Sequence, residues 1–401
     1  MKSNWYKVKL RDVCVQITDG VHNTVYDNTE GDYFLLSCKN IKNGVVYIGD
    51  KERRIDKKTL EKLRSRTKMS IGDVLISSVG TIGETAIVKE DNPPYEFQRS
   101  VAIFKPNQHY ITPRFLYYSL RHKKKKLQHL AEGAVQQCLF INPLKEFEIS
   151  IPTLEEQEKI VNVLSSLDNK IELNEKINQN LEAQAQAIFK SWFVDFEPFK
   201  NGKFVDSELG KIPEGWVVNT LSNIVSLKKG KKPKNLSETK HKNYMPYLTI
   251  DALSGGNPLF CDTGKMLLAK EKDILLVMDG ASSGTIFYGL DGVVASTIIK
   301  LELAEFEVRE IIFAFLNYKQ SDLKSHTIGS AIPHLDKDRL LSYKIALPSN
   351  EKLLRKISDT LTSLRDNIVR NKKESRRLSQ LRDTLLPKLM SGEIDVSDVA
   401  V

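Results

Sequence analysis

One tetrapeptide in this sequence has the residue types and spacing to act on a nucleic-acid base. Asn92-Pro93-Pro94-Tyr95 matches the motif with which amino-methyltransferases hold a flipped adenine between a polar side chain and an aromatic ring. Such an enzyme also needs a glycine-rich turn that cradles its cofactor inside a wound parallel sheet. The sequence contains no such turn, and the matching stretch of the second half, Gly289 to Gly292, reads as a simple turn between strands. We therefore interpret the prolines as part of a hairpin loop, and a stand-alone N6-adenine methyltransferase is the alternative function.

Two dense lysine runs could contact phosphate groups. Lys123 to Lys126 falls at the end of a predicted helix, where a solvated face and a DNA contact are both open explanations. The second run lies in a loop that contains glycine and proline, a shape that can follow a phosphate backbone. It comprises Lys228, Lys229, Lys231, Lys232 and Lys234. Of the two, the second run is the stronger candidate.

Reading a base edge requires flat side chains that offer two hydrogen-bonding groups, such as Arg, Asn and Gln. Residues of this kind, with lysines and hydroxyl groups beside them, occur in loop-like stretches of both halves. For each residue alone, an ordinary solvated side chain is the alternative. The candidates for DNA contact in the first half are Lys39, Asn40, Lys42, Ser78, Thr81, Gln98, Arg99, Gln136 and Gln137. In the second half they are Ser282, Ser283, Ser330 and His334, beside the lysine run.

No other reactive arrangement stands out. The four cysteines, Cys14, Cys38, Cys138 and Cys261, are far apart, with no C-x-x-C pair and no histidine at ligand spacing. They predict neither a disulfide framework nor a zinc site. The sequence has no Ser-His-Asp arrangement, paired-carboxylate motif or phosphate-binding loop, so we predict a binding module without catalytic residues, metal or cofactor of its own.

Length and composition set the frame for these motifs. The chain has 401 residues, of which 41% are hydrophobic, enough for two to three domains with real cores. The net charge of +9 points toward a polyanionic partner. No apolar run is long enough to span a membrane, and the charged start, Met1 to Leu10, does not resemble a secretory signal. We expect a cytoplasmic protein.

Two long helices with a shared heptad seam are the elements that must position these loops. Apolar residues alternate at spacings of four and three, which is typical of a coiled coil. The first seam is Ile160, Leu164, Leu167, Ile171, Asn174, Asn178, Leu181, Ala185, Ile188 and Trp192. A shift of 197 residues, which takes Ile160 to Ile357, gives the second: Ile357, Leu361, Leu364, Ile368, Asn371, Ser375, Leu378, Arg382, Leu385 and Leu389. We predict that the helices pair, in either direction, with Asn174 close to Asn371, and that a unit of domain plus helix was duplicated.

The segments before each helix share one plan. Short apolar runs such as Tyr33 to Ser37 and Asp73 to Ser77, broken by glycines, predict strands and turns, while Pro113 to Leu130 predicts a helix. The second copy repeats this order between Trp216 and Pro348. We predict an α+β fold with an internal pseudo-two-fold repeat. The expected boundaries are 1–152 and 201–348 for the two domains, and 153–200 and 349–401 for the two helical regions.

Local signals predict where the helices begin and end. Thr153 to Glu156 fits a capping box that starts the first helix, whereas the second begins less ideally at Ser349. We expect Pro198 to stop the first helix and Pro387 to kink or end the second. The aromatic cluster near the end of the first helix could pack on the chain's own domains or dock another subunit. It comprises Phe189, Trp192, Phe193, Phe196 and Phe199.

Six segments follow the pattern of a known family: Gly72 to Ser77, Gly80 to Gly83, Ile151 to Ile160, Phe189 to Pro198, Ile212 to Trp216, and Leu385 to Ile394. Through these segments, nearly the whole chain resembles the specificity subunits of type I restriction-modification enzymes. The chain departs from the family pattern at Asn350 to Ile357, where the usual acidic-glutamine helix start is replaced, and at Arg382 in the seam.

The resemblance implies two target recognition domains that alternate with two long helices, which pair as an antiparallel coiled coil. Each domain would read one half of a bipartite, asymmetric DNA target. The helices would fix the spacing and carry two modification subunits that methylate adenine from S-adenosylmethionine, and restriction subunits would join the complex. A coil of roughly 50 Å would correspond to a target on the order of 15 base pairs. A pure assembly protein held by its coil is a further alternative.

Overall fold

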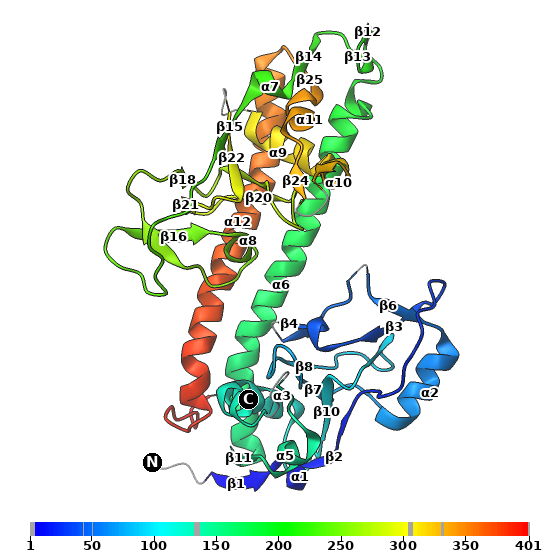
Figure 1. The fold of residues 1–401 in the computed structure, drawn as a ribbon, viewed down its shortest axis with the longest axis vertical. Helices are drawn as coiled ribbons and strands as arrows, with labels where there is room; N and C mark the ends of the chain where they lie inside the picture. Colours follow the sequence, from blue (N-terminus) through cyan, green and yellow to red (C-terminus); the bar gives the residue numbers. More distant parts are fainter. Residues whose placement is uncertain are drawn as a thin grey trace. The chain divides into compact units, whose positions relative to one another are not determined.

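The computed structural model describes residues 5–42, 44–49, 51–131, 137–303, 308–329 and 333–399. The chain divides into two compact units, each of which includes part of both long helices, α6 (Leu154–Phe193) and α12 (Glu351–Leu389) (Figure 1). Unit 1 comprises Met1–Leu173 and Glu374–Val401, and unit 2 comprises Asn174–Lys373.

Unit 1 is built on two main sheets. A four-stranded antiparallel sheet has the order β2-β10-β7-β8, and a three-stranded sheet has the order β6-β3-β9, in which β3 and β9 run parallel. Strand β1 (Tyr6–Lys9) pairs with β11 (Glu148–Ile151), and β4 (Ile41–Lys42) pairs with β5 (Val45–Val46). The strands of the two main sheets are β2 (Cys14–Asp19), β10 (Val101–Pro106), β7 (Val74–Ser77), β8 (Thr85–Ile87), β6 (Arg53–Ile55), β3 (Tyr33–Leu36) and β9 (Tyr95–Phe97).

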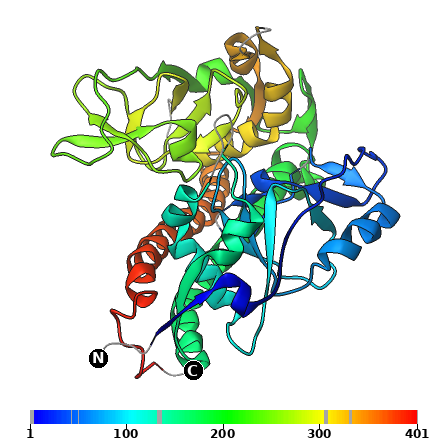
Figure 2. The same cartoon turned by 60° about the horizontal axis from the view of Figure 1, so that its bottom comes forward.

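Both faces of the four-stranded sheet of unit 1 are buried, which explains why β7 is apolar without alternation. Ile76 and Phe104 belong to a core that includes Leu116 of α3, whereas Leu75 and Ile103 belong to a second core. Helix α2 lies beside the three-stranded sheet (Figure 2), where Leu60 packs with residues of β3 and β6. The helices of unit 1 before α6 are α1 (Leu10–Val13), η1 (Cys38–Asn40), α2 (Lys57–Thr67), α3 (Pro113–His122), α4 (Lys124–His129) and α5 (Ile141–Glu146).

Unit 2 contains a matching pair of main sheets. One has the order β15-β22-β19-β20 and is antiparallel, and the other has the order β17-β16-β21-β18, in which β16 and β21 run parallel. The strands are β15 (Val225–Lys229), β22 (Ile298–Leu303), β19 (Ile274–Val277), β20 (Ile286–Tyr288), β17 (Phe260–Asp262), β16 (Tyr244–Leu248), β21 (Gly292–Val294) and β18 (Leu268–Ala269). Three short pairs complete the unit: β14 (Trp216–Thr220) with β25 (Lys344–Pro348), β12 (Phe204–Ser207) with β13 (Gly210–Pro213), and β23 (Thr327–Ile328) with β24 (His334–Leu335).

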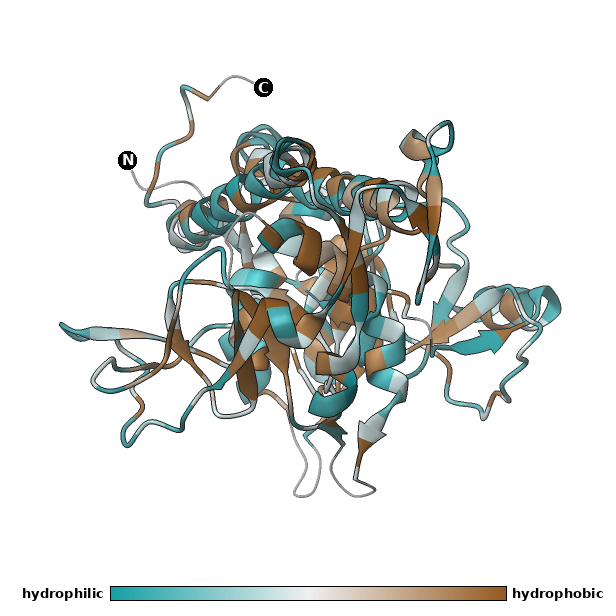
Figure 3. Cartoon of the chain, turned by 90° about the horizontal axis from the view of Figure 1, so that it is seen from above, coloured by the Kyte–Doolittle hydropathy of each residue, from teal (hydrophilic) through white to brown (hydrophobic). Residues whose placement is uncertain are grey.

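The buried faces of unit 2 repeat the layering of unit 1. Leu276 and Leu301 share a core with Ile312 of α9, and Leu275 and Ile298 share another with the second sheet. Colouring by hydropathy shows many strands as apolar and many long loops as hydrophilic (Figure 3). The helices are η2 (Glu197–Phe199), α7 (Leu221–Ile224), α8 (Ile250–Leu253), α9 (Arg309–Tyr318), α10 (Gln320–Ser325) and α11 (Lys337–Ser342).

The matched strand orders confirm the mixed α+β class and the internal repeat predicted from sequence. In both units a strand near the start pairs with the last strand, the four-stranded sheet has the same order, and one parallel pair occurs in the second sheet. The described part of the chain has no helix both long and apolar enough to cross a membrane.

The long helices contact each other inside each unit. In unit 1, Arg382 Nη1 lies 2.7 Å from Asp168 Oδ1 and Lys170 Nζ lies 3.4 Å from Glu374 Oε2. In unit 2, Asn371 Nδ2 donates to Asn178 Oδ1 at 2.9 Å. This bond lies one turn further along α6 than Asn174, the residue that the sequence pattern places close to Asn371.

The helix ends differ from the sequence prediction in two places. α12 is capped by Asn350, whose Oδ1 accepts from Leu353 N at 3.1 Å, and not by Ser349. α6 ends at Phe193, before Pro198, and Phe196 adopts a left-handed conformation with φ of 52°. Pro387 lies inside the last turn of α12, which continues to Leu389.

The aromatic cluster after α6 packs inside unit 2. Phe193, Phe196 and Phe199 surround Trp216 edge to face, with ring centroids 5.5, 5.4 and 5.1 Å away. Of the two explanations left open by the sequence, the structure therefore supports packing on the chain's own domain.

Trp5, the counterpart of Trp216, contacts the start of α6 in unit 1. Its Nε1 donates to Glu156 Oε1 at 2.9 Å, while Thr153 Oγ1 accepts from Glu156 N at 3.3 Å.

Candidate nucleic-acid interface

Four loops of unit 1 meet beside its four-stranded sheet, and we call them loop junction 1: residues 19–22, 78–83, 98–100 and 137–139. Val21 N donates to Phe97 O at 2.8 Å, and Arg99 N donates back to Val21 O at 3.0 Å. Ser78 N donates to Ser100 O at 2.9 Å, and Leu139 N donates to Ser78 O at 2.8 Å. Backbone hydrogen bonds therefore fix the loops to one another.

Unit 2 has an equivalent loop junction 2, formed by residues 229–232, 279–284, 295–297 and 333–335. Gly230 N donates to Ile298 O at 3.0 Å, and Met278 N donates to Thr297 O at 2.8 Å. Gly280 N donates to Pro333 O at 2.9 Å, and Leu335 N donates to Met278 O at 2.8 Å. The same backbone scaffold thus presents different side chains in the two units.

A glycine makes the close approach in each junction possible. A Cβ atom on Gly20 would lie 2.1 Å from the carbonyl oxygen of Phe97, and one on Gly230 would lie 2.3 Å from that of Val294. Both distances are far below any van der Waals contact, so these positions require the absence of a side chain. No local pattern in the sequence marks these two glycines as equivalent.

In loop junction 1, acidic and basic groups lie together. Arg66 Nη2 of α2 and His22 Nε2 each lie 2.6 Å from the carboxylate of Asp19. Burial raises the pKa of Cys138, the positive charge of Arg99 lowers it and the negative charge of Asp19 raises it again, with a net increase. Because Arg99 is exposed, its guanidinium is available to a base or a phosphate.

In loop junction 2, one carboxylate contacts two basic side chains. His334 Nδ1 lies 2.8 Å and Lys229 Nζ 3.3 Å from Asp279. Partial burial raises the pKa of Asp279, but the hydrogen bonds from His334 and Lys229 outweigh it, and the net pKa is lowered. Asp279 therefore stays ionised and holds both side chains in place.

Three of the candidates from the sequence are buried, and the structure contradicts a base contact for them. Asn40 is 1% exposed, and its amide group accepts from Ser37 N at 2.9 Å and donates to Tyr47 O at 2.8 Å. Ser78 and Ser283 are buried as well, with hydroxyl groups that donate to backbone carbonyls. These side chains hold loops together and do not face solvent.

Most of the remaining candidates belong to one of the two junctions. Thr81, Gln98, Arg99 and Gln137 belong to loop junction 1, and Lys229, Lys231, Lys232, Ser282 and His334 to loop junction 2. Lys39 is exposed on η1, whose residue Cys38 donates from N to Ser100 Oγ at 3.0 Å. Gln136 and Ser330 lie outside the described residues.

Two lysines lie away from the junctions. Lys228 is 3.9 Å from Glu302 on the neighbouring strand, and alternation along β15 points it to the opposite face from Lys229. Lys42 is exposed on β4, beside the edge of β8. Sequence reasoning missed Asp19 and Asp279 of the junctions and Arg66 of α2, because the partners Arg66 and His334 are distant in sequence from these carboxylates. It also missed His22, which contacts Asp19.

The first lysine run is partly engaged by the protein itself. Lys124 of α4 forms an ion pair with Glu84, which follows the glycine loop. Burial, reinforced by the positive charge of Lys126, lowers the pKa of Lys123. These contacts favour a structural role for part of this run.

The Asn92-Pro93-Pro94-Tyr95 motif does not form a base pocket. It connects β8 to β9, which pair with different strands, so the prediction of a hairpin loop is wrong. The Tyr95 ring is buried against Phe97, and burial raises the pKa of Tyr95 to about 12. Arg64 Nη2 donates to the carbonyl oxygens of Pro93 and Tyr95 at 2.6 and 2.8 Å. The segment is a structural connection in which Pro93 and Tyr95 are buried and Asn92 is exposed.

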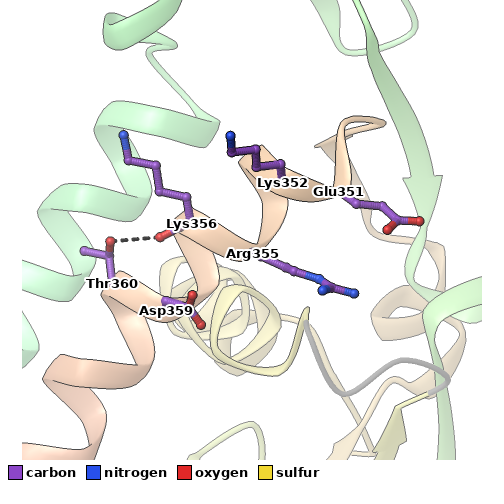
Figure 4. A pocket seen from close by; sticks show the side chains of 6 residues that line it. All are labelled: Glu351, Lys352, Arg355, Lys356, Asp359 and Thr360. Atoms are coloured by element: carbon purple, nitrogen blue, oxygen red, sulfur yellow. Dashed lines mark hydrogen bonds between the residues drawn. The ribbon is translucent and has the colours of Figure 1, made fainter.

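Two further features concern possible ligand sites in the described part of the chain. A pocket at the start of α12 is lined by Glu351, Lys352, Arg355, Lys356, Asp359 and Thr360, and Figure 4 shows Lys352 and Lys356 pointing to the same side. Its lining is charged and comes from one helix. Within the described ranges, no cluster of His, Cys, Asp and Glu could hold a metal ion.

Comparison with known proteins agrees with this architecture. Residues 2–183 and 213–380 match the family described as the type I restriction modification DNA specificity domain. The chain is 29% identical to the type I restriction enzyme MjaIX specificity subunit of Methanocaldococcus jannaschii, over 99% of this chain and 95% of the relative. It is 23% identical to the HindI specificity subunit of Haemophilus influenzae, over 98% of this chain and all of the relative.

A solved structure shares the fold. The S subunit of a type I restriction-modification system from M. genitalium superimposes with a TM-score of 0.56 at 20% identity, covering 97% of this chain and 96% of that one. The two family matches together span most of the sequence, so the chain belongs to the specificity subunits of type I restriction-modification systems. These are non-catalytic DNA-recognition components, and a stand-alone methyltransferase is not favoured.

Proposed function

We propose that the two units read the two halves of a bipartite, asymmetric DNA target. The observation that carries the proposal is the repeated junction: one backbone scaffold occurs twice and presents Thr81, Arg99 and Gln137 in unit 1 but Ser282 and His334 in unit 2. Two domains that both bind DNA but prefer different bases need the same backbone scaffold with different side chains on it.

Different side chains would contact the bases and the phosphates. Arg99, Gln98 and Gln137 can make the two-pronged contacts that distinguish bases in the major groove. Exposed lysines, among them Lys39, Lys231 and Lys232, would contact phosphates and position the unit on the duplex.

The long helices would pair as an antiparallel coiled coil that sets the spacing between the half-sites. In the ion pairs that join the helices, rising residue numbers on α6 meet falling numbers on α12, from Asp168–Arg382 in unit 1 to Glu182–Arg365 in unit 2. The buried Asn178 and its partner Asn371 supply a polar layer of the kind that fixes register.

The partners of this chain would be double-stranded DNA, two modification subunits docked on the helices, and restriction subunits that join through the complex. S-adenosylmethionine would be bound by the modification subunits and not by this chain. The charged pocket at the start of α12 gives that end of the helix a polar surface for docking.

Mapping methylated adenines across the genome of a host that carries this chain with its modification subunit tests the proposal. We expect a single asymmetric motif with two defined parts separated by unspecified bases. A palindromic motif, or one continuous block of bases, would contradict it.

A further inference from the structure

Two ion pairs between the long helices have the same polarity, with the acidic residue on α6 and the basic residue on α12. In unit 1, Asp168 of α6 lies 2.7 Å from Arg382 of α12. In unit 2, Glu182 of α6 lies 3.8 Å from Arg365 of α12. At both places α6 supplies the carboxylate and α12 the guanidinium group.

The internal repeat relates these positions to one another. A shift of 197 residues takes Asp168 to Arg365, so the same place on the two helices carries opposite charges. If a second α12 replaced α6 in the same register, Arg365 would take the place of Asp168 and face Arg382. If a second α6 replaced α12, Asp168 would take the place of Arg365 and face Glu182.

Burial makes the charges of the two arginines effective discriminators. Only 7% of the Arg365 side chain and 11% of the Arg382 side chain is exposed, so salt and water screen them weakly. Each unit also fixes its own charge. Tyr118 Oη donates to Asp168 at 2.7 Å. Arg365 Nε lies 3.7 Å from the buried carboxylate of Glu310, and the Arg365 guanidinium lies 4.2 Å from the centre of the Phe313 ring.

Two further ion pairs between the helices, each within one unit, agree with this rule. Lys170 lies 3.4 Å from Glu374, and their counterparts in the repeat, Asn367 and Ile177, are uncharged, so this attraction exists only between α6 and α12. Lys372 lies 3.5 Å from Glu182, and its counterpart is Glu175, which would repel Glu182 in a pair of α6 helices.

We propose that Asp168, Glu182, Arg365 and Arg382 make the two halves of this chain select each other and reject the same half of a second copy. The inference rests on the pairing of α6 with α12 in the proposed function. Like charges would meet in either homotypic pair, whereas opposite charges meet in the heterotypic one. Within one chain, the first half therefore pairs with the second half, and two identical halves from different copies do not pair.

The test starts from the intact chain with a specific protease site inserted between Asn201 and Gly202, in the exposed turn before β12. The folded protein is cut, and native mass spectrometry counts pairs of unlike and like halves. We expect the wild type to remain almost entirely unlike pairs. Arg382→Asp places an aspartate opposite Asp168 in the unlike pair and opposite Arg365 in the second-half pair. It should raise the ratio of second-half pairs to unlike pairs by about tenfold or more, equivalent to about 1.4 kcal/mol.

The double variant Asp168→Arg/Arg382→Asp should restore the unlike pairs, and Arg377→Asp, an exposed charge reversal on the same helix, should leave the wild-type distribution unchanged. A wild type that scrambles statistically, or an Arg382→Asp variant that pairs like the wild type, would overturn charge selection and leave helix pairing intact. Halves that separate into monomers on cutting would overturn the pairing as well.

Discussion

Asn371 of α12 donates a hydrogen bond to Asn178 of α6 at 2.9 Å, and this contact lies within the seam predicted from the heptads. Asn178 is buried, so its side chain depends on this partner for part of its hydrogen bonding. Polar layers of this kind fix register at some cost in stability.

Asn371→Leu should therefore lower the free energy of unfolding by about 1–3 kcal/mol, because it leaves a buried amide without its partner. Replacing both residues by Leu should recover most of that loss, since two apolar groups can pack where two polar ones bonded. Urea unfolding of the intact chain measures both values. Asn367→Ala, on the same helix, is the control, and equal effects of the single and the double change would refute the coupling.

Arg64→Ala tests the buried connection around Tyr95. Burial raises the pKa of the Glu96 carboxyl, and hydrogen bonds from Thr67 and Arg64 and the charge of Arg64 partly offset it. The folded state therefore binds the proton of Glu96 more tightly than the unfolded state does. As pH rises above the ordinary pKa of this carboxyl, its ionisation lowers the free energy of unfolding. Removing Arg64 makes this loss of stability larger.

We expect Arg64→Ala to destabilise unit 1 by about 3–5 kcal/mol at pH 8 and by less near pH 5. Glu96→Gln in the same background should recover part of the loss and flatten the pH dependence. Thermal unfolding at the two pH values measures this. A loss of stability that does not change with pH would argue against a buried carboxylate.

Lys231→Ala/Lys232→Ala should weaken binding to all DNA sequences alike. If each lysine neutralises one phosphate, the slope of log affinity against log salt should become shallower by about 0.9 for each lysine replaced. Lys228→Ala is the matched control, because Lys228 pairs with Glu302 on the other face of β15. Titrations at several salt concentrations distinguish the two; a full effect from Lys228→Ala would contradict the assignment of faces.

Asp279→Asn should release Lys229 and His334 from their shared carboxylate. The junction becomes more positive, so we expect tighter binding to unrelated DNA and a smaller ratio of specific to non-specific affinity, by about tenfold. Competition binding with target and unrelated duplexes measures the ratio. An unchanged ratio would show that this cluster lies outside the interface.

The sequence predicted the parts of this protein that repeat at regular spacing. The seam from Ile160 and its copy from Ile357 predicted two long helices and the duplication, because periodicity is a local property. The two loop junctions could not be predicted from the sequence, because they depend on contacts between distant segments, such as that of Gly20 with Phe97. The prediction for Asn40 was wrong for the same reason. Its polar side chain suggested an exposed position, whereas its amide group is hydrogen-bonded to the backbone of Ser37 and Tyr47 and closes a turn.

Variants of a single junction test most directly whether each unit reads its own half of the target. Genome-wide maps of methylated adenine would be compared for the wild type, Arg99→Ala in loop junction 1 and His334→Ala in loop junction 2, each expressed with the modification subunit. We predict that each variant relaxes base preference in one half of the motif and leaves the other half unchanged. Loss of preference in both halves from either variant would contradict it.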